Sequence, residues 1–286
     1  MPEVTPRPPW RDMDLATLER AYSPSSALDG PLDPFIQAYV DKSRQAYDLC
    51  PGMVTLAYGD KATQTIDIVA PEAPGAVPLL IFIHGGYWQE LSKREAFFPA
   101  PDALARGMAF ATVDYSLCPD VTLDDIVEEC CAAVTRLITE AGALGVDPGR
   151  VVLSGSSAGA HLAAMVCARL PAALRPAGVV LLSGVFDLEP LIDTYINAAV
   201  GLDLSAARRN SPVRLDLRGF PPALVAWGQQ ETDEFKRQSR HFAGLLQAEG
   251  RRACVLDVAG RNHFDIVEDI ANDTELGRAM AALVAT

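Results

Sequence analysis

The chain lacks the long apolar runs and the ligand motifs that would place it among membrane proteins or metalloenzymes. No apolar run among its 286 residues reaches the roughly 18 residues needed to span a bilayer. Its four histidines and six cysteines form neither HExxH nor CxxC, two spacings that commonly hold zinc. Residues 1–9 lack the charged and then apolar layout of a signal peptide. We therefore expect a soluble, cytoplasmic protein that uses no metal and no other cofactor.

Basic residues are also too few for a protein that binds polyanions. The chain has 24 Lys and Arg against 37 Asp and Glu, which gives a formal net charge of −13. Such a charge disfavours nucleic acid and anionic membranes as partners. We therefore expect a small-molecule substrate, no nucleic acid and no membrane, and we leave a homodimer open.

The six cysteines do not suggest a disulfide framework. Cys130 and Cys131 are adjacent, and no CxxC pair occurs. Dense disulfide frameworks belong mainly to small secreted domains, whereas this chain has 286 residues. We expect reduced and buried thiols.

Strand-like and helix-like segments alternate along most of the chain. Residues 77–83 are continuously apolar, as is typical of a strand that is buried on both faces. Other predicted strands cover residues 53–58, 65–69, 109–115, 151–153, 178–182, 223–227 and 253–258. Helices are predicted over residues 34–47, 123–141, 158–170 and 235–249, and at the C-terminus. This order predicts an α/β fold with a mostly parallel central sheet and helices on both faces.

Two segments fall outside this alternation. Residues 1–50 are polar and punctuated by proline, and we expect them to form an N-terminal helical arm beside a single domain over residues 51–286. About forty residues separate the strand at 178–182 from the strand at 223–227, which is more than one crossover helix needs. We expect a small helical cap at about 188–210.

The strongest chemical motif is GSSAG at residues 155–159, which matches GxSxG. A predicted strand precedes it and a predicted helix follows it, which is the context of the nucleophile in the α/β-hydrolase fold. We predict that Ser157 is the nucleophile, because the spacing disfavours the adjacent Ser156. The N–H of Ala158, at the start of the helix, would help to stabilise an oxyanion.

The second motif is HGGYW at residues 84–88, which follows the buried strand. In hydrolases of this fold a glycine-rich loop at this place supplies backbone donors to the oxyanion hole. We assign these donors to Gly86 and Tyr87, with Gly85 as the alternative. His84 is expected to hold the loop by hydrogen bonds, and Trp88 to contact either the substrate or the core.

The general base is expected late in the chain, because this fold orders its triad as serine, acid and histidine. His263 directly follows the last predicted strand. His161 lies one turn beyond the nucleophile on its helix, and His241 lies on an amphipathic helix away from the strand ends. We therefore predict His263 as the base and structural roles for the other two.

Three acidic residues follow the strand at 223–227. Glu231 stands three residues after Gly228, which is the usual spacing of the triad acid, and we favour it. Asp233 remains the rival, although it could also cap the next helix. Glu234 is then expected to lie on the solvated face of that helix.

Four segments together resemble the kynurenine formamidases, also called arylformamidases. They are HGGYW at 84–88, GSSAGAHLA at 155–163, GQQETDEFKRQS at 228–239 and NHFDI at 262–266. The resemblance runs from about Trp10 to the C-terminus and implies metal-free hydrolysis of N-formyl-L-kynurenine to kynurenine and formate. It matches Ser157 and His263 to the family's nucleophile and base. The family usually has aspartate where this chain has Glu231.

The resemblance also directs attention to the substrate contacts. Trp88, Phe186 and Phe264 would suit the aromatic ring of a formylkynurenine. Candidates for the amino-acid end of the substrate are Arg11, Tyr195, Asn197 and Ser211. A carboxylesterase for small acyl or aryl esters would use the same machinery with a different pocket. A non-catalytic binding protein is the third reading, against which the complete serine, histidine and acid set argues.

Overall fold

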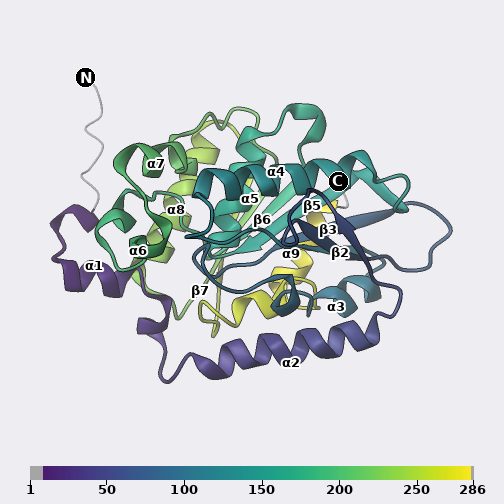
Figure 1. Cartoon of the computed structure of the whole chain (residues 1–286), viewed down its shortest axis with the longest axis horizontal. Coiled ribbons are helices and arrows are strands. Elements are labelled where there is room, and N and C mark those ends of the chain that lie inside the picture. The colour runs from purple at the N-terminus through teal and green to yellow at the C-terminus, as the bar shows by residue number, and fades with distance from the viewer. Residues whose placement is uncertain (1–8, 285–286) are drawn as a thin grey trace.

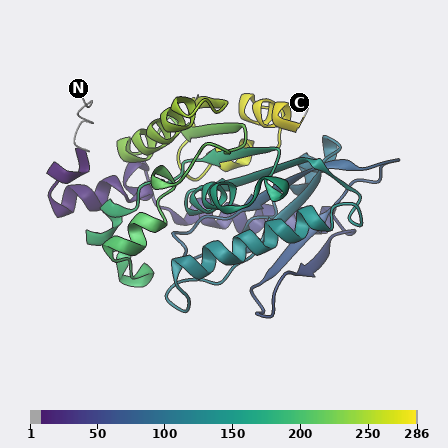
Figure 2. The same ribbon diagram turned by 90° about the horizontal axis from the view of Figure 1, so that it is seen from above.

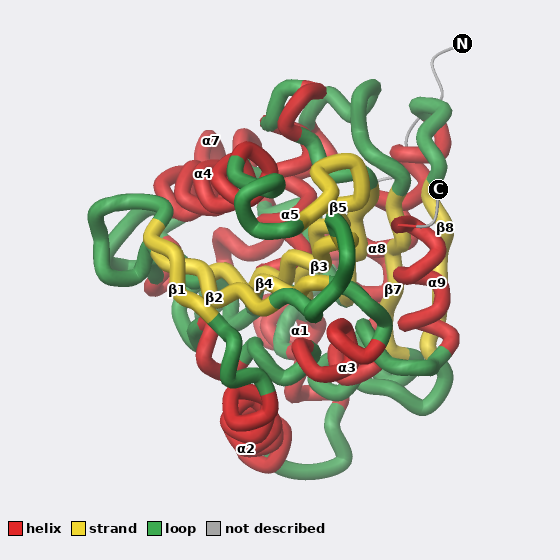
Figure 3. Tube along the Cα trace, turned by 90° about the vertical axis from the view of Figure 1, so that its right-hand side faces the viewer, coloured by secondary structure: helices red, strands yellow, loops and turns green. Residues whose placement is uncertain are grey.

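A mostly parallel β-sheet forms the centre of the molecule in the computed structural model, which describes residues 9–284. Within those residues the sheet has eight strands in the order β1-β2-β4-β3-β5-β6-β7-β8, and Figure 3 shows β1 at one edge and β8 at the other. All neighbouring strands are parallel except the pairs β1–β2 and β2–β4. The strands are β1 (Val54–Ala57), β2 (Thr65–Val69), β3 (Val77–Ile83), β4 (Ala109–Val113), β5 (Val146–Ser156), β6 (Gly178–Leu182), β7 (Ala223–Gly228) and β8 (Ala253–Val258).

Helices cover both faces of this sheet. The α-helices of the described residues are α1 (Leu15–Ala21), α2 (Asp33–Leu49), α3 (Ala100–Ala105), α4 (Leu123–Thr139), α5 (Ala158–Arg169), α6 (Asn197–Val200), α7 (Leu204–Arg209), α8 (Asp233–Ala248) and α9 (Glu275–Val284). Side chains of α4, α5 and α8 join one hydrophobic core, and those of α2, α3 and α9 join the core on the opposite face. Figure 1 shows α4 and α5 on one side of the sheet and α2 and α3 on the other. The predicted mostly parallel sheet with helices on both faces is confirmed.

The uninterrupted apolar character of β3 follows from this arrangement. Successive side chains of a strand point to opposite faces of the sheet. Leu79 and Ile81 therefore enter one core, whereas Leu80 and Phe82 enter the other. A strand that is covered on both sides has no position for a polar side chain.

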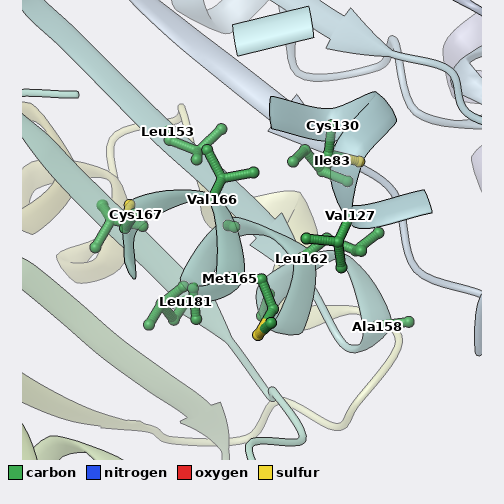
Figure 4. Close-up of a cluster of buried hydrophobic side chains, with 14 of the residues drawn as sticks. Ile83, Val127, Cys130, Leu153, Ala158, Leu162, Met165, Val166, Cys167 and Leu181 are labelled. Atoms are coloured by element: carbon green, nitrogen blue, oxygen red, sulfur yellow. The ribbon is translucent and has the colours of Figure 1, made fainter. Parts of the chain in front are cut away.

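Helix α5 is the most deeply enclosed helix near the carboxyl ends of the strands. Its residues from Ala158 to Cys167 are all buried. Figure 4 shows Leu162 and Met165 on α5 among side chains from the strands and from α4. A helix that is apolar on all sides belongs in a core, and its rigid surroundings fix the residue at its N-terminal end.

The N-terminal segment packs against the body of the molecule. Tyr22 belongs to one core, and Tyr39 and Ala46 belong to the other. Figures 1 and 2 show α1 beside α6 and α7 at the same end of the molecule. The segment predicted as a cap contains a 3-10 helix (Glu189–Asp193) together with α6 and α7. We keep the arm over residues 1–50, the domain over residues 51–286 and the cap at about 188–210 as proposals, and residues 1–8 and 285–286 lie outside the described part.

Two of the predicted strands differ from the structure by two or more residues at one or both ends. The strand predicted at 109–115 ends at Val113, and the strand predicted at 151–153 extends over Val146–Ser156. Pro148 and Gly149 interrupt the apolar pattern of the longer strand, which conceals its first half in the sequence.

The cysteines are all free thiols. The expectation that they are buried holds for four of them, but Cys131 is only half-buried and Cys254 is exposed. Cys254 lies on the edge strand β8, where the side chains of Cys254 and Val255 are both left uncovered. Among the described residues no three His, Cys, Asp or Glu side chains gather closely enough to hold a metal ion, and no described helix has the length and apolar character to cross a membrane.

Candidate active site

Ser157 occupies a sharp turn between β5 and α5. Its backbone has φ 57° and ψ −120°, a conformation that side chains other than glycine rarely adopt. The glycines on either side of the turn are required by close packing of the backbone. A Cβ on Gly155 would lie 2.2 Å from the carbonyl oxygen of Gly159, and one on Gly159 would lie 2.0 Å from that of Ile83. The GxSxG pattern is therefore what this turn demands, and it presents Ser157 at the carboxyl end of the sheet.

The loop after β3 forms the second part of the site. Its positive φ angles at Gly86 (96°) and Tyr87 (47°) produce a tight turn, in which the Gly86 carbonyl accepts hydrogen bonds from the N–H groups of Gln89 and Glu90 at 2.9 and 3.0 Å. The N–H groups of Gly86, Tyr87 and Ala158 have no acceptor within the described part of the chain. These are the three donors that the sequence assigns to an oxyanion hole, and they are available for that role.

His84 holds this loop in place through its contacts with Tyr115 and Gly85. Its ring stacks on Tyr115 with 4.2 Å between the ring centroids, and its Nδ1 lies 2.9 Å from the Gly85 carbonyl oxygen. The Tyr115 hydroxyl donates to the His84 carbonyl at 2.9 Å. These contacts fit the expected role of His84 in holding the loop.

Glu231 and His263 form a buried pair. The His263 Nδ1 lies 3.0 Å from Glu231 Oε2, and the two residues are 4% and 6% exposed. A carboxylate can only accept a hydrogen bond, so Nδ1 carries the proton and Nε2 is left to act as a base. Asp233 is exposed and stands in the first turn of α8. The structure therefore brings Glu231, and not its rival Asp233, to the histidine.

Ser183 supports this pair and has no role in the sequence-based reading. Its hydroxyl donates to Glu231 Oε1 at 2.5 Å, and the Gly228 N–H donates to the same oxygen at 2.5 Å. Ser183 has φ 52°, so its backbone is strained at the point where β6 ends. The available signal was its position, because it is a polar residue directly after a buried strand.

The loop that carries His263 is held by its neighbours. The Asn262 Oδ1 accepts hydrogen bonds from the N–H groups of Phe264 and Asp265 at 2.8 and 3.2 Å. The ring of Phe235 packs edge-on to His263, with 4.5 Å between centroids. The imidazole is thus fixed by its ring contact as well as by its bond to the carboxylate.

Ser157 and His263 line a common cavity of about 250 Å³. Its wall is drawn from the N-terminal segment, the loop after β3, the predicted cap and the loop that carries His263. Most of this wall is apolar or aromatic, including Leu32, Ile36, Tyr39, Phe82, Tyr87, Phe98, Tyr195, Ile196, Phe264 and Val267. The site can therefore hold a small, largely apolar molecule against Ser157.

Of the three aromatic residues that were predicted to contact the substrate, one lines the cavity and two do not. Phe264 lines the cavity. Trp88 and Phe186 are fully buried in the core and do not belong to the described cavity wall. Trp88 packs edge-on to His161 at 5.0 Å, and Phe186 stacks on Phe242 at 4.4 Å. The prediction that Trp88 and Phe186 contact the substrate is wrong, because both rings pack in the core.

The four candidates for the amino-acid end of the substrate also lie in different environments. Tyr195 lines the cavity and is 55% exposed. The Asn197 side chain bonds to backbone groups of its own segment, and the Ser211 hydroxyl donates to the Ala207 carbonyl at 2.7 Å. Arg11 pairs with Glu189 at 3.1 Å. Only Tyr195 of these four is among the described residues that line the cavity.

Glu234 differs from its expected place on a solvated helix face. It is 3% exposed, accepts a hydrogen bond from the Tyr22 hydroxyl at 2.8 Å and pairs with Arg237 at 2.8 Å. The N-terminal segment covers this face of α8, which the local sequence of α8 does not reveal. The hydroxyl of Tyr87 donates to the Tyr22 carbonyl at 2.6 Å, so the same segment also holds the loop after β3.

His161 has a structural environment. It is fully buried on α5, and its Nε2 lies 2.7 Å from the Asn210 carbonyl oxygen. Burial lowers the pKa of His161 to about 4, so the ring is neutral at pH 7. His241 lies exposed on α8. His84 also lines the cavity, and its Nε2 lies 3.7 Å from Asp114 Oδ1. His263 differs from it because its Nδ1 is within hydrogen-bond distance of a buried carboxylate, at 3.0 Å from Glu231 Oε2.

Comparison with known proteins agrees with this geometry. Residues 80–265 match a family model described as the alpha/beta hydrolase fold. The chain is 30% identical to kynurenine formamidase of Salmo salar over 92% of its own length and 94% of the relative's, and 30% identical to kynurenine formamidase of Danio rerio over 93% and 95%. A solved structure of an esterase from the archaeon Pyrobaculum calidifontis has a TM-score of 0.73 at 22% identity and covers 96% of this chain and 93% of that chain. This last likeness concerns the fold alone.

Proposed function

The chain belongs to the kynurenine formamidase family of α/β-hydrolases and is a hydrolase, and from this premise we propose that it cleaves N-formyl-L-kynurenine to L-kynurenine and formate. The observation that carries the proposal is the Glu231–His263 pair, whose histidine lines one small, mostly apolar cavity together with Ser157. Its relatives of nearly equal length are named for this reaction. We assign the nucleophile to Ser157, the base to His263 and the orienting acid to Glu231.

The first half of the reaction forms a formyl-serine. His263 takes the proton of the Ser157 hydroxyl through Nε2 while the serine oxygen attacks the formyl carbon. The N–H groups of Gly86, Tyr87 and Ala158 stabilise the negative oxygen of the tetrahedral intermediate. His263 then gives its proton to the departing nitrogen, which leaves as the free arylamine of kynurenine.

The second half releases formate. Water loses a proton to His263 and attacks the formyl carbon of the acyl-serine, and the serine oxygen recovers the proton as it leaves. Glu231 stabilises the protonated imidazole in both halves, since it accepts from Nδ1 throughout. An arylamine is a better leaving group than an alkylamine, so a site with esterase-like machinery is sufficient for this amide.

The shape of the site supports a small acyl group and an aromatic leaving group. A Cβ on Gly85 would lie 3.2 Å from that of Ser157 and 2.9 Å from the Ser156 carbonyl oxygen, so little space remains beside the nucleophile. The apolar wall that includes Phe264 and Tyr87 offers a broad surface to an aryl ring. The cavity of about 250 Å³ suits a compact substrate better than a long acyl chain.

The test compares two substrates on one preparation. We expect kcat/KM for N-formyl-L-kynurenine in the ordinary enzyme range, about 10⁴ M⁻¹s⁻¹ or higher. Acetanilide analogues should be much poorer, because the extra methyl group must fit beside Gly85. An enzyme that turns over p-nitrophenyl acetate well and leaves N-formyl-L-kynurenine untouched would contradict the proposal and favour a carboxylesterase.

A further inference from the structure

The cavity beside Ser157 holds negative side chains without a positive one. Glu90 and Glu95 belong to its wall, whereas none of the described lining residues is lysine or arginine. Glu95 already has partners, because its Oε2 accepts from the N–H and the hydroxyl of Ser92 at 2.9 and 2.8 Å. Glu90 is exposed, and no cation of the described chain pairs with it. One carboxylate in the cavity is therefore free to bind a cation.

Glu90 also lies next to the oxyanion loop. Its N–H donates to the Gly86 carbonyl at 3.0 Å, and a Cβ on Gly86 would lie 3.2 Å from the Cβ of Glu90. A Cβ on the preceding Gly85 would lie 3.2 Å from the Cβ of Ser157. Two consecutive glycines thus separate the nucleophile from Glu90, and the carboxylate extends from the same turn that supplies the oxyanion donors.

We propose that Glu90 determines specificity by pairing with an ammonium group on the leaving arylamine. This inference rests on the proposed function, since the substrate class named there has an amino-acid end with one ammonium and one carboxylate. Opposite charges attract, and like charges repel. The ammonium therefore faces Glu90, and the substrate carboxylate, which has no cation on the described wall, faces the solvent.

Three aryl formamides with the same formyl group and ring separate the two charges. The first is N-formyl-L-kynurenine, the second is its decarboxylated analogue with the amine alone, and the third is its deaminated analogue with the acid alone. For the wild-type chain we expect kcat/KM to be at least as high for the amine as for the zwitterion, and about tenfold lower for the acid. Raising the salt to about 1 M should reduce this difference, because ionic screening weakens the pair.

The variant Glu90→Gln keeps the size of the side chain and removes its charge. We expect it to lower kcat/KM about fivefold for the two ammonium substrates, mainly through KM, and to leave the acid unchanged or improved. Glu72→Gln is the matched control, because it makes the same change of net charge on an exposed loop at the opposite end of β3. This control should leave the order of the three substrates unchanged.

The outcomes keep the two proposals apart. If Glu90→Gln lowers all three rates equally, or if the wild-type chain accepts the acid as well as the amine, the specificity role of Glu90 is overturned while formamide hydrolysis stands. If the wild-type chain cleaves none of the formamides, the proposed function fails. The same three side chains on aryl acetates then test Glu90 on whichever esters the enzyme accepts, with the same expected order.

Discussion

At the scale of single residues, the site depends on how firmly one carboxylate is held. Glu231 gives one oxygen to His263 and the other to the Ser183 hydroxyl and the Gly228 N–H. Each donor fixes the carboxylate in one orientation, so the imidazole keeps its proton on Nδ1. The glutamate side chain is accommodated within this arrangement.

This arrangement predicts unequal effects of two neighbouring substitutions. Glu231→Gln should lower kcat by orders of magnitude, about 10³–10⁴-fold, with little change in KM, because the imidazole loses the partner that orients and stabilises it. Asp233→Asn should change kcat less than about threefold, since an exposed carboxylate in the first turn of a helix contributes only a small electrostatic effect. Steady-state kinetics on both variants checks this, and the reverse ranking would move the acid to Asp233.

At the scale of secondary-structure elements, α5 has the proposed nucleophile Ser157 at its N-terminal end and a buried histidine, His161, within its first turns. His161 is neutral in the folded protein because burial lowers its pKa to about 4 from the ordinary value of 6.5. The unfolded chain therefore binds more protons than the folded chain between these two values. The stability that His161 contributes is fully present above pH 6.5 and is lost as the pH falls towards 4.

The size of this loss can be measured. The difference between the pKa of about 4 in the folded chain and the ordinary value of 6.5 corresponds to about 3 kcal/mol of unfolding free energy, lost as the pH falls from 6.5 to 4. The free energy of unfolding can be measured by urea unfolding at several pH values. It should fall more steeply with decreasing pH for the wild-type chain than for His161→Gln, which cannot take up the proton. Parallel curves for the two proteins would show that His161 does not titrate in this way.

Much of the framework could be predicted from local sequence. The strands at 77–83, 178–182 and 253–258 have the predicted bounds, because apolar runs between breakers mark strands clearly. Ser157 lies on the expected turn, and His263 and Glu231 lie beside each other as their places after β8 and β7 suggest.

Side chains near the site were harder to place. Trp88 belongs to the HGGYW motif and Phe186 follows a predicted strand, yet both pack into the core. Glu234 is covered by the N-terminal segment through Tyr22, which lies 212 residues earlier in the chain. Burial of such residues is decided by distant parts of the chain. Ser183 was missed for a related reason, since its partner Glu231 is 48 residues further along.

At the scale of the whole molecule, three separate parts of the chain complete one cavity. Ser25 and Tyr39 come from the N-terminal segment, Tyr195 comes from the predicted cap, and Ser157 and His263 come from the sheet ends. The molecule has a net charge of −13, and Glu90 gives its cavity a negative charge as well. Such a molecule attracts cationic groups and repels anionic ones.

The central claim is that Ser157 is the nucleophile that takes the formyl group, and active-site labelling tests it most directly. A fluorophosphonate should abolish turnover of N-formyl-L-kynurenine in proportion to the fraction of chain labelled, and mass spectrometry should find the adduct on Ser157. Ser157→Ala should take up no label and should lose at least about 10³-fold in kcat/KM. Labelling of another serine, or full activity in Ser157→Ala, would contradict the account.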